Sequence, residues 1–199
     1  VDHSQRLMRD PSSDRLALQN LTSGTTGLPK IVPLTLDMLE KNAFATLRGL
    51  PYSDRETLYS PVPYRFISAI SHFLVTLAAG GRYIGTETLL LPGQILQKLI
   101  MCQATAFGGS PIHLRYLGDL LETDANSVSL NWVMSSGDNL PVGVISNLKR
   151  LAPQMKVITA YGLTELAGRF CVLPDEVQDK KIGSVGKPLD ILSARIVDD

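Results

Sequence analysis

Short apolar runs alternate with segments of helical periodicity between residues 16 and 160, and this alternation limits the chain to few folds. Strands are predicted at 16–22, 57–61, 82–85, 104–107, 130–135 and 156–160. Helices are predicted around 36–47 with Thr35 as N-cap, and at 66–79, 93–101, 112–121 and 142–151. Strands joined by helices of about ten residues form right-handed βαβ units. We therefore predict an α/β fold, a mostly parallel sheet with helices on both faces.

The pattern changes after Tyr161. Two further strands are predicted at 168–173 and 192–197, with no helix between them. We therefore expect two units: an α/β core over residues 1–165 and the start of a small β-rich subdomain over residues 166–199.

Charge and composition exclude several classes of partner. The 199 residues contain 19 basic and 19 acidic side chains, so the formal net charge is zero. Nucleic acids and anionic membrane surfaces attract basic proteins, so neither is an expected partner. The longest apolar run, 66–81, is shorter than the roughly 20 residues that a bilayer requires. Without a signal peptide or a disulfide framework, a cytoplasmic location is expected.

In a parallel sheet, ligands bind at the loops that follow the carboxyl ends of the strands. The first such loop is rich in hydroxyl groups and glycine and ends in a lysine, a composition that suits a polyphosphate. It differs from the Walker loop because Pro29 stands where that loop has its second glycine, and Ile31 follows the lysine. A flexible turn is the alternative. The candidate phosphate-binding residues are Thr22, Ser23, Gly24, Thr25, Thr26, Gly27 and Lys30.

Two further loops follow predicted strands. Tyr161–Glu165 offers an aromatic ring for stacking, the Thr164 hydroxyl for a phosphate and the Glu165 carboxylate for Mg²⁺. Residues 135–141 read Ser-Ser-Gly-Asp-Asn-Leu-Pro, which suits either ligand contact or a helix cap at Asp138 or Asn139. Taken alone, neither loop decides between a ligand site and an ordinary strand-to-helix connection.

Together these segments resemble the adenylate-forming enzymes, which include acyl- and aryl-CoA synthetases, luciferase and the adenylation domains of nonribosomal peptide synthetases. Residues 22–30 are similar to that family's TSGTTGxPK signature, and 161–165 to its YGxTE motif. Residues 135–140 resemble its adenine loop, and 183–188 resemble its GSVGKP segment. The four matches occur in the family's order along the chain.

The resemblance implies a ligase that works in two steps. A carboxylic acid attacks the α-phosphorus of Mg·ATP, and coenzyme A or the phosphopantetheine of a carrier protein then takes the acyl group. It implies that the loop from Thr22 to Gly27 and Lys30 hold the leaving phosphates. Thr164 would contact the α-phosphate, and Glu165 would bind Mg²⁺. The adenine would lie against the remaining predicted residues: Gly137, Asp138, Asn139, Ala160, Tyr161 and Gly162.

The resemblance also indicates where the acid would bind. The family often has PLFH where this chain has Pro-Val-Pro-Tyr, so Tyr64 replaces a histidine that gates the acyl pocket. No aspartate for a substrate amine follows, which favours a simple carboxylic acid. Arg65 would either pair with a second carboxylate or be solvated. The predicted substrate pocket consists of Tyr64, Phe66, Ile67, Gly108 and Gly109.

The family's ribose-binding aspartate, hinge and adenylating lysine all follow the GSVGKP segment, and the sequence stops at Asp199. The chain is therefore expected to be a central fragment without normal turnover, which self-associates through open sheet edges. The alternative hypothesis is a nucleotide-binding module or degenerate homologue that performs no ligation. A P-loop phosphotransferase is disfavoured by Pro29 and Ile31.

Overall fold

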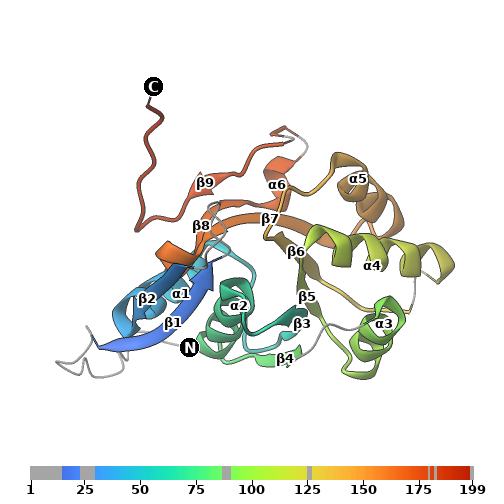
Figure 1. Ribbon diagram of the computed structural model, residues 1–199. Coiled ribbons are helices and arrows are strands. Elements are labelled where there is room, and N and C mark those ends of the chain that lie inside the picture. The colour runs from blue at the N-terminus through green and yellow to red at the C-terminus, as the bar shows by residue number, and fades with distance from the viewer. Residues whose placement is uncertain are drawn as a thin grey trace.

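A seven-stranded, mainly parallel sheet forms the centre of the molecule (Figure 1). The computed structural model describes residues 15–22, 30–86, 91–124, 127–178, 180–181 and 183–197. The strand order is β4-β3-β5-β6-β7-β8-β9, in which neighbours from β4 to β7 are parallel and β8 and β9 are antiparallel. In that order the strands are Arg82–Thr86, Thr57–Pro63, Ala106–Gly109, Trp132–Ser136, Lys156–Leu163, Gly168–Leu173 and Lys187–Pro188.

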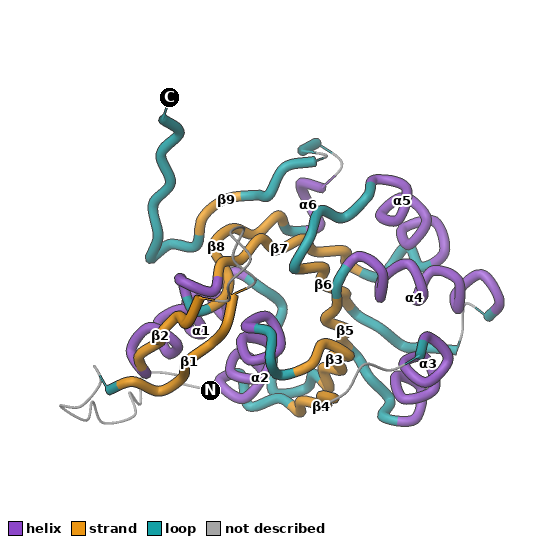
Figure 2. The backbone as a smooth tube through the Cα atoms, in the orientation of Figure 1, coloured by secondary structure: helices purple, strands orange, loops and turns teal. Residues whose placement is uncertain are grey.

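Helices cover both faces of the sheet, as predicted (Figure 2). Helices α1 (Leu36–Gly49) and α2 (Ile67–Ala78) lie on one face, and α3 (Pro92–Met101), α4 (Pro111–Thr123) and α5 (Val142–Leu151) lie on the other. Alternate strand residues therefore enter two separate cores. The side toward α1 and α2 holds Leu58, Ala106, Trp132, Met134 and Ile158, and the opposite side holds Tyr59, Phe107, Val133 and Val157.

Local signals in the sequence set the starts of the helices. The Thr35 hydroxyl accepts a hydrogen bond from the Met38 N–H at 3.2 Å, which caps α1 as predicted. Pro92 and Pro111 are the first residues of α3 and α4, where the fixed φ of proline suits a helix and its missing N–H costs nothing. None of the described helices is both long enough and apolar enough to span a membrane.

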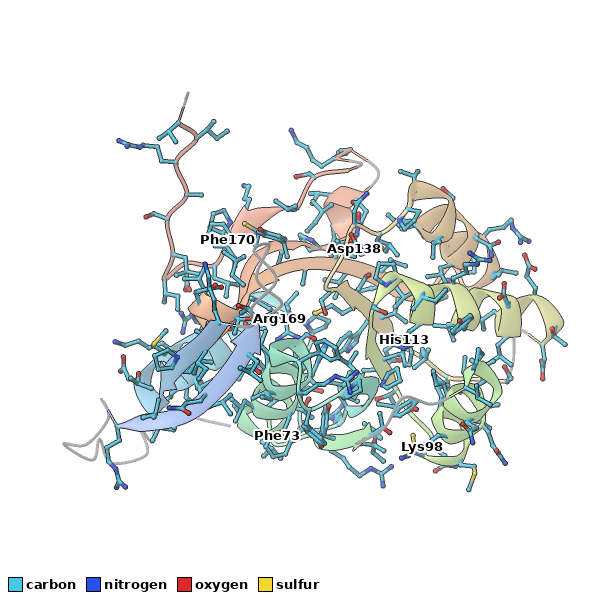
Figure 3. The ribbon with its side chains drawn as sticks, in the orientation of Figure 1. Phe73, Lys98, His113, Asp138, Arg169 and Phe170 are labelled. Atoms are coloured by element: carbon cyan, nitrogen blue, oxygen red, sulfur yellow. The ribbon has the colours of Figure 1, made fainter. Side chains whose placement is uncertain are left out.

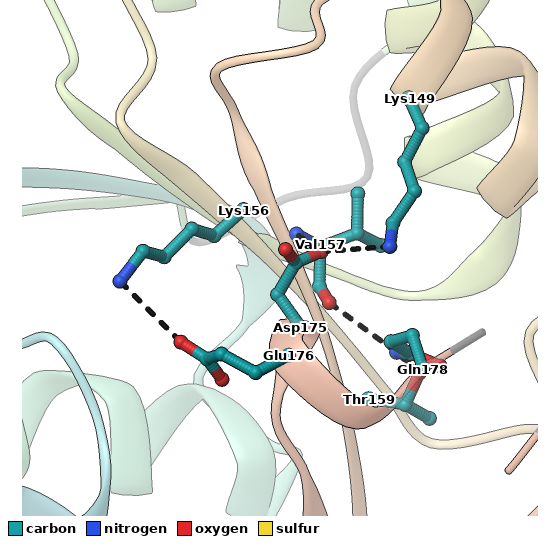
Figure 4. Close-up of polar contacts among 7 residues, drawn as sticks. All are labelled: Lys149, Lys156, Val157, Thr159, Asp175, Glu176 and Gln178. Atoms are coloured by element: carbon teal, nitrogen blue, oxygen red, sulfur yellow. Dashed lines mark hydrogen bonds and ion pairs between the residues drawn. The ribbon is translucent and has the colours of Figure 1, made fainter. Parts of the chain in front are cut away.

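A short helix, α6 (Asp175–Gln178), fastens the chain that follows β8 to the neighbouring strand β7 (Figure 4). The Gln178 side chain donates to the Val157 carbonyl and, at 2.8 Å, to the Thr159 hydroxyl. The Asp175 carboxylate accepts from the Val157 N–H at 3.0 Å and pairs with Lys149. These bonds hold the last strands of the sheet against its parallel part.

The predicted first strand has the expected bounds, but it does not belong to the main sheet. Strand β1 (Leu16–Thr22) is mostly exposed, and it pairs antiparallel with β2 (Lys30–Thr35), which was not predicted, in a separate two-stranded sheet. An apolar run is compatible with either a central strand or a hairpin, because the run itself does not specify a partner.

The strand predicted at 192–197 is also wrong. These residues form no strand, and the Ile196 side chain is 97% exposed. The final strand is β9, which pairs with Cys171 and Val172 of β8. Strand β8 itself pairs with β7 of the main sheet. The division into a core and a β-rich subdomain that begins at residue 166 stays a prediction.

The hairpin is held to the main body by a small apolar cluster. Leu34 of β2 packs with Leu39 of α1 and with Ala167, which ends the 3₁₀ turn η1 (Thr164–Leu166). Strand β2 also contacts η1 directly. Strand β2, which begins at Lys30, and the turn that ends the YGLTE segment are therefore held together on one side of the molecule.

A substitution at Gly108 of β5 tests how tightly α2 packs on the sheet. A methyl group at this position would lie 2.5 Å from Cε1 of the buried His72 ring. We therefore expect Gly108→Ala to lower the free energy of unfolding by about 1–3 kcal/mol. Gly143 of α5 has open space at its Cβ position, so Gly143→Ala should be neutral or stabilise by about 0.5–1 kcal/mol. Urea unfolding of the two variants measures this difference, and equal stability would contradict the packing described for His72.

Candidate functional site

A crevice of about 200 Å³ opens at the carboxyl ends of β6 and β7, beside the start of α2. It receives residues from five separate segments of the chain, which the parallel order of the strands brings to one edge. Its lining consists of Asn20, Leu21, Arg65, Phe66, Ile67, Ser68, Ser71, Ser136, Gly137, Ala160, Gly162, Thr164, Gly168 and Arg169.

Six of the predicted site residues line this crevice. They come from the start of α2, the loop after β6, and β7 with the turn that follows it. These are Phe66, Ile67, Gly137, Ala160, Gly162 and Thr164. The predicted acid-binding and nucleotide-binding segments therefore share one cavity.

The hairpin that carries the predicted phosphate loop reaches the same cavity. Asn20 and Leu21 of β1 form part of its lining, and the next residue, Thr22, pairs with Lys30 across the hairpin. Lys30 is exposed and is not among the residues that line the crevice. The intervening predicted residues Ser23, Gly24, Thr25, Thr26 and Gly27 lie outside the described residues.

The loop after β6 presents backbone to the crevice rather than large side chains. Gly137 has a φ of 95°, a conformation that glycine adopts without strain, and a Cβ there would meet open space. Asp138 and Asn139 are exposed and do not line the crevice, and the Asp138 carboxylate accepts a bond from the Asn139 N–H. Figure 3 shows Asp138 in this loop.

The YGLTE segment is divided between the crevice and solvent. Tyr161 is 42% exposed, and its ring centroid lies 6.1 Å from that of Phe170. Glu165 is exposed in η1, and no cluster of three His, Cys, Asp or Glu side chains occurs among the described residues. A single carboxylate is enough to bind Mg²⁺ when the ion arrives with a nucleotide, because phosphate oxygens and water molecules then supply the other ligands.

Three residues of the predicted substrate pocket do not line the crevice. The Tyr64 ring packs against Phe73 and Tyr83, with centroids 6.3 and 6.0 Å away. Gly108 lies against the His72 ring and Gly109 against His113. The assignment of Tyr64, Gly108 and Gly109 to substrate binding stays a prediction.

The most unusual group in the crevice, Arg169, was not predicted. Figure 3 labels Arg169. This residue is 3% exposed, and its guanidinium group donates to Tyr52, Ser71 and His72. The backbone of Arg169 is in turn held by the buried Asn42 amide of α1, at 2.7 Å from its carbonyl. A charged residue inside the otherwise apolar run 168–173 was the signal that would have revealed it.

Burial and charge keep the imidazole of His72 neutral. The ring is fully buried, which is the main reason that its pKa lies well below 6.5, and the guanidinium of Arg169 lowers the pKa further. Nδ1 lies 2.8 Å from a guanidinium nitrogen of Arg169 and therefore accepts, so the proton of the ring is on Nε2. His72 thus acts as a neutral acceptor that holds Arg169 in place.

Comparison with known proteins gives consistent matches. The family described as AMP-binding enzyme matches residues 2–199. The 2-succinylbenzoate–CoA ligase of Bacillus velezensis is 28% identical over 94% of this chain and 37% of its own length. The 4-chlorobenzoate–CoA ligase of Pseudomonas sp. is 30% identical over 72% of this chain and 28% of its own. E. coli MenE with bound OSB-AMS superposes with a TM-score of 0.74 at 27% identity, covering 89% of this chain and 36% of that one. The chain therefore spans only about a third of the length of these relatives.

The low pKa of His72 predicts an acid-sensitive fold. Below about pH 6.5 the unfolded state takes up a proton that the native ring cannot accept, so this contribution to stability is present above that pH and is lost as the pH falls. We expect the stability of the intact protein to fall by up to about 1.4 kcal/mol per pH unit from this group between pH 6.5 and 5. Urea unfolding at pH 7.5 and 5 measures it.

His72→Gln serves as the comparison for that measurement. His113, whose pKa is also lowered by burial, remains in both proteins, so the difference between their pH dependences isolates His72. The variant should show a smaller loss on acidification. An identical loss in both proteins would mean that His72 does not titrate as described.

Proposed function

Since this chain belongs to the AMP-binding enzyme family, we propose that it is the part of an acid–thiol ligase that binds ATP and a carboxylic acid for adenylation. In that reaction a carboxylate oxygen bonds to the α-phosphorus of ATP. The bond between the α-phosphorus and the bridging oxygen breaks, and pyrophosphate leaves. The sulfur of a thiol then bonds to the acyl carbon, the bond between that carbon and the phosphate oxygen breaks, and AMP leaves. The names of the two similar ligases favour coenzyme A over the phosphopantetheine of a carrier protein as that thiol.

One observation carries the proposal: the crevice joins segments that would have to meet for this chemistry. Asn20 and Leu21 come from the hairpin with the hydroxyl-rich loop, Gly137 from the loop after β6, and Gly162 and Thr164 from the YGLTE segment. Phosphate, adenine and acid would therefore occupy adjoining parts of one cavity, and alignment is the main task of an enzyme of this kind.

The chain's own residues have distinct proposed roles. Lys30 supplies a positive charge to the leaving phosphates, together with the hydroxyl groups of residues 22–26. Thr164 donates to the α-phosphate, and Glu165 accepts Mg²⁺, which supplies charge neutralisation when it is bound with ATP. Gly137–Asn139 and Ala160–Gly162 flank the adenine. Phe66 and Ile67 form the apolar side of the acid pocket, which is consistent with a small carboxylic acid as substrate. We propose the cytoplasm as the location of the enzyme.

The assigned charges can be tested in the intact protein by acid-dependent ATP–pyrophosphate exchange. Lys30→Ala and Glu165→Ala should each lower the kcat/KM of exchange at least tenfold, about 1.4 kcal/mol of transition-state stabilisation. Lys41→Ala and Glu122→Ala remove exposed charges of α1 and α4 and serve as matched controls that should keep normal exchange.

Two results would contradict the proposal. Exchange that is unchanged in both Lys30→Ala and Glu165→Ala would remove the roles assigned to these residues. ATP binding by the intact protein without exchange for any acid would instead identify a nucleotide-binding module.

A further inference from the structure

Arg169 places a positive charge in the buried part of the crevice with no acidic partner among the described residues. Its Nε donates to the sulfur of Met134, one Nη to the Ser71 hydroxyl, and the other Nη to the Tyr52 hydroxyl at 3.1 Å and to His72 Nδ1. All four acceptors are uncharged. A guanidinium group has five N–H donors, so one N–H, on the nitrogen that binds Ser71, has no acceptor in the described part of the chain.

The other described residues of the crevice add positive charge. Arg65 also contributes to the lining, and no Asp or Glu occurs among the lining residues that the structure describes. Arg65 is exposed with its guanidinium carbon 4.8 Å from the centroid of the Phe66 ring, whereas Arg169 and Ser71 are each only 3% exposed. The crevice therefore has an open rim near Arg65 and a closed end near Arg169, both of which favour an anion.

Two buried hydroxyl groups, those of Ser71 and Ser136, line the same crevice as Arg169. The Ser71 oxygen accepts from the guanidinium group, so its own hydrogen is free to donate elsewhere. The Ser136 side chain is buried, lines the crevice, and has no hydrogen-bond partner among the described residues. A buried hydroxyl without a partner is uncommon in proteins unless a ligand or water satisfies it.

We propose that the acid activated by this protein carries a second carboxylate, which binds at the closed end to Arg169, Ser71 and Ser136. This inference rests on the proposed function and names the class of its substrate. A charge-assisted bond from Arg169 would give the buried cation its counter-ion, and the two hydroxyl groups would complete the shell of that carboxylate. The reacting carboxylate then lies toward Thr164 and the open rim.

The walls of the crevice indicate the character of the rest of the substrate. Phe66 and Ile67 contribute apolar side chains to the same lining as Arg169 and Thr164. The proposed substrate is therefore a dicarboxylic acid with an apolar spacer between its two carboxylates.

A purely structural role for Arg169 makes a different prediction. The same side chain joins β8 to α2 and to the loop before β3, so its removal will lower stability in either case. Only the substrate role predicts a change in the relative rates for acids with one and two carboxylates. That ratio is the decisive measurement, because a general loss of folded protein affects both acids equally.

The experiment uses ATP–pyrophosphate exchange by the intact protein with matched pairs of acids, such as adipate with hexanoate and glutarate with pentanoate. The wild type should prefer the dicarboxylic member of at least one pair tenfold or more in kcat/KM. Arg169→Met should lower that preference at least tenfold, and Arg169→Lys should lower it less. Arg150→Met, at an exposed arginine of α5 that pairs with Glu122, should keep the wild-type ratio.

Each outcome decides the inference. A wild-type preference for the monocarboxylic acids, or a ratio unchanged in Arg169→Met, overturns it and leaves the proposed function standing. If the intact protein binds ATP but shows no exchange with any acid, both the inference and the proposed function are overturned. If Arg169→Met gives no cooperative thermal transition, Ser71→Ala replaces it: a ratio lowered threefold or more supports the second-carboxylate site, and an unchanged ratio overturns it.

Discussion

The parallel pairing of β3, β5, β6 and β7 is the constraint on which the site depends. Because these strands run in one direction, the chain leaves the sheet at the same edge after each of them, and each following loop becomes a neighbour of the others. The pairing is stabilised from both faces, since alternate residues of every strand enter one of two helix-covered cores. A short polar loop can therefore take part in the site while the strand before it remains fully buried.

The edge of the parallel sheet is completed by an antiparallel strand that carries charge into the interior. Strand β8 turns back along β7 after η1, and Asn42 of α1 binds the backbone at Leu166 and Arg169 on either side of Gly168. The Arg169 side chain then passes beneath α2, where the neutral His72 accepts from it. Burying a charge with only neutral partners costs several kcal/mol, so this arrangement is better explained by an anionic ligand than by stability.

Residue patterns predicted the parts of this fold that depend on short-range order. The βαβ alternation, the bounds of α5 and β8 and the cap at Thr35 follow from periodicity and capping, which are local properties. The hairpin of β1 and β2 was missed because partner choice is a property of the whole fold. The shared crevice could be expected from the strand ends. The charge within the apolar run 168–173 marks Arg169 as unusual, but its place in the crevice depends on the packing of α2 against β8, which the sequence does not specify.

The central claim is that adenosine lies between the loop after β6 and the YGLTE segment, and photolabelling of the intact protein with 8-azido-ATP tests it most directly. The account predicts adducts, suppressed by excess ATP, in peptides that contain residues 137–139 or 160–162. Adducts suppressed by ATP but confined to the groove between α1 and β9, which is lined by Arg48 and Lys187, would contradict it.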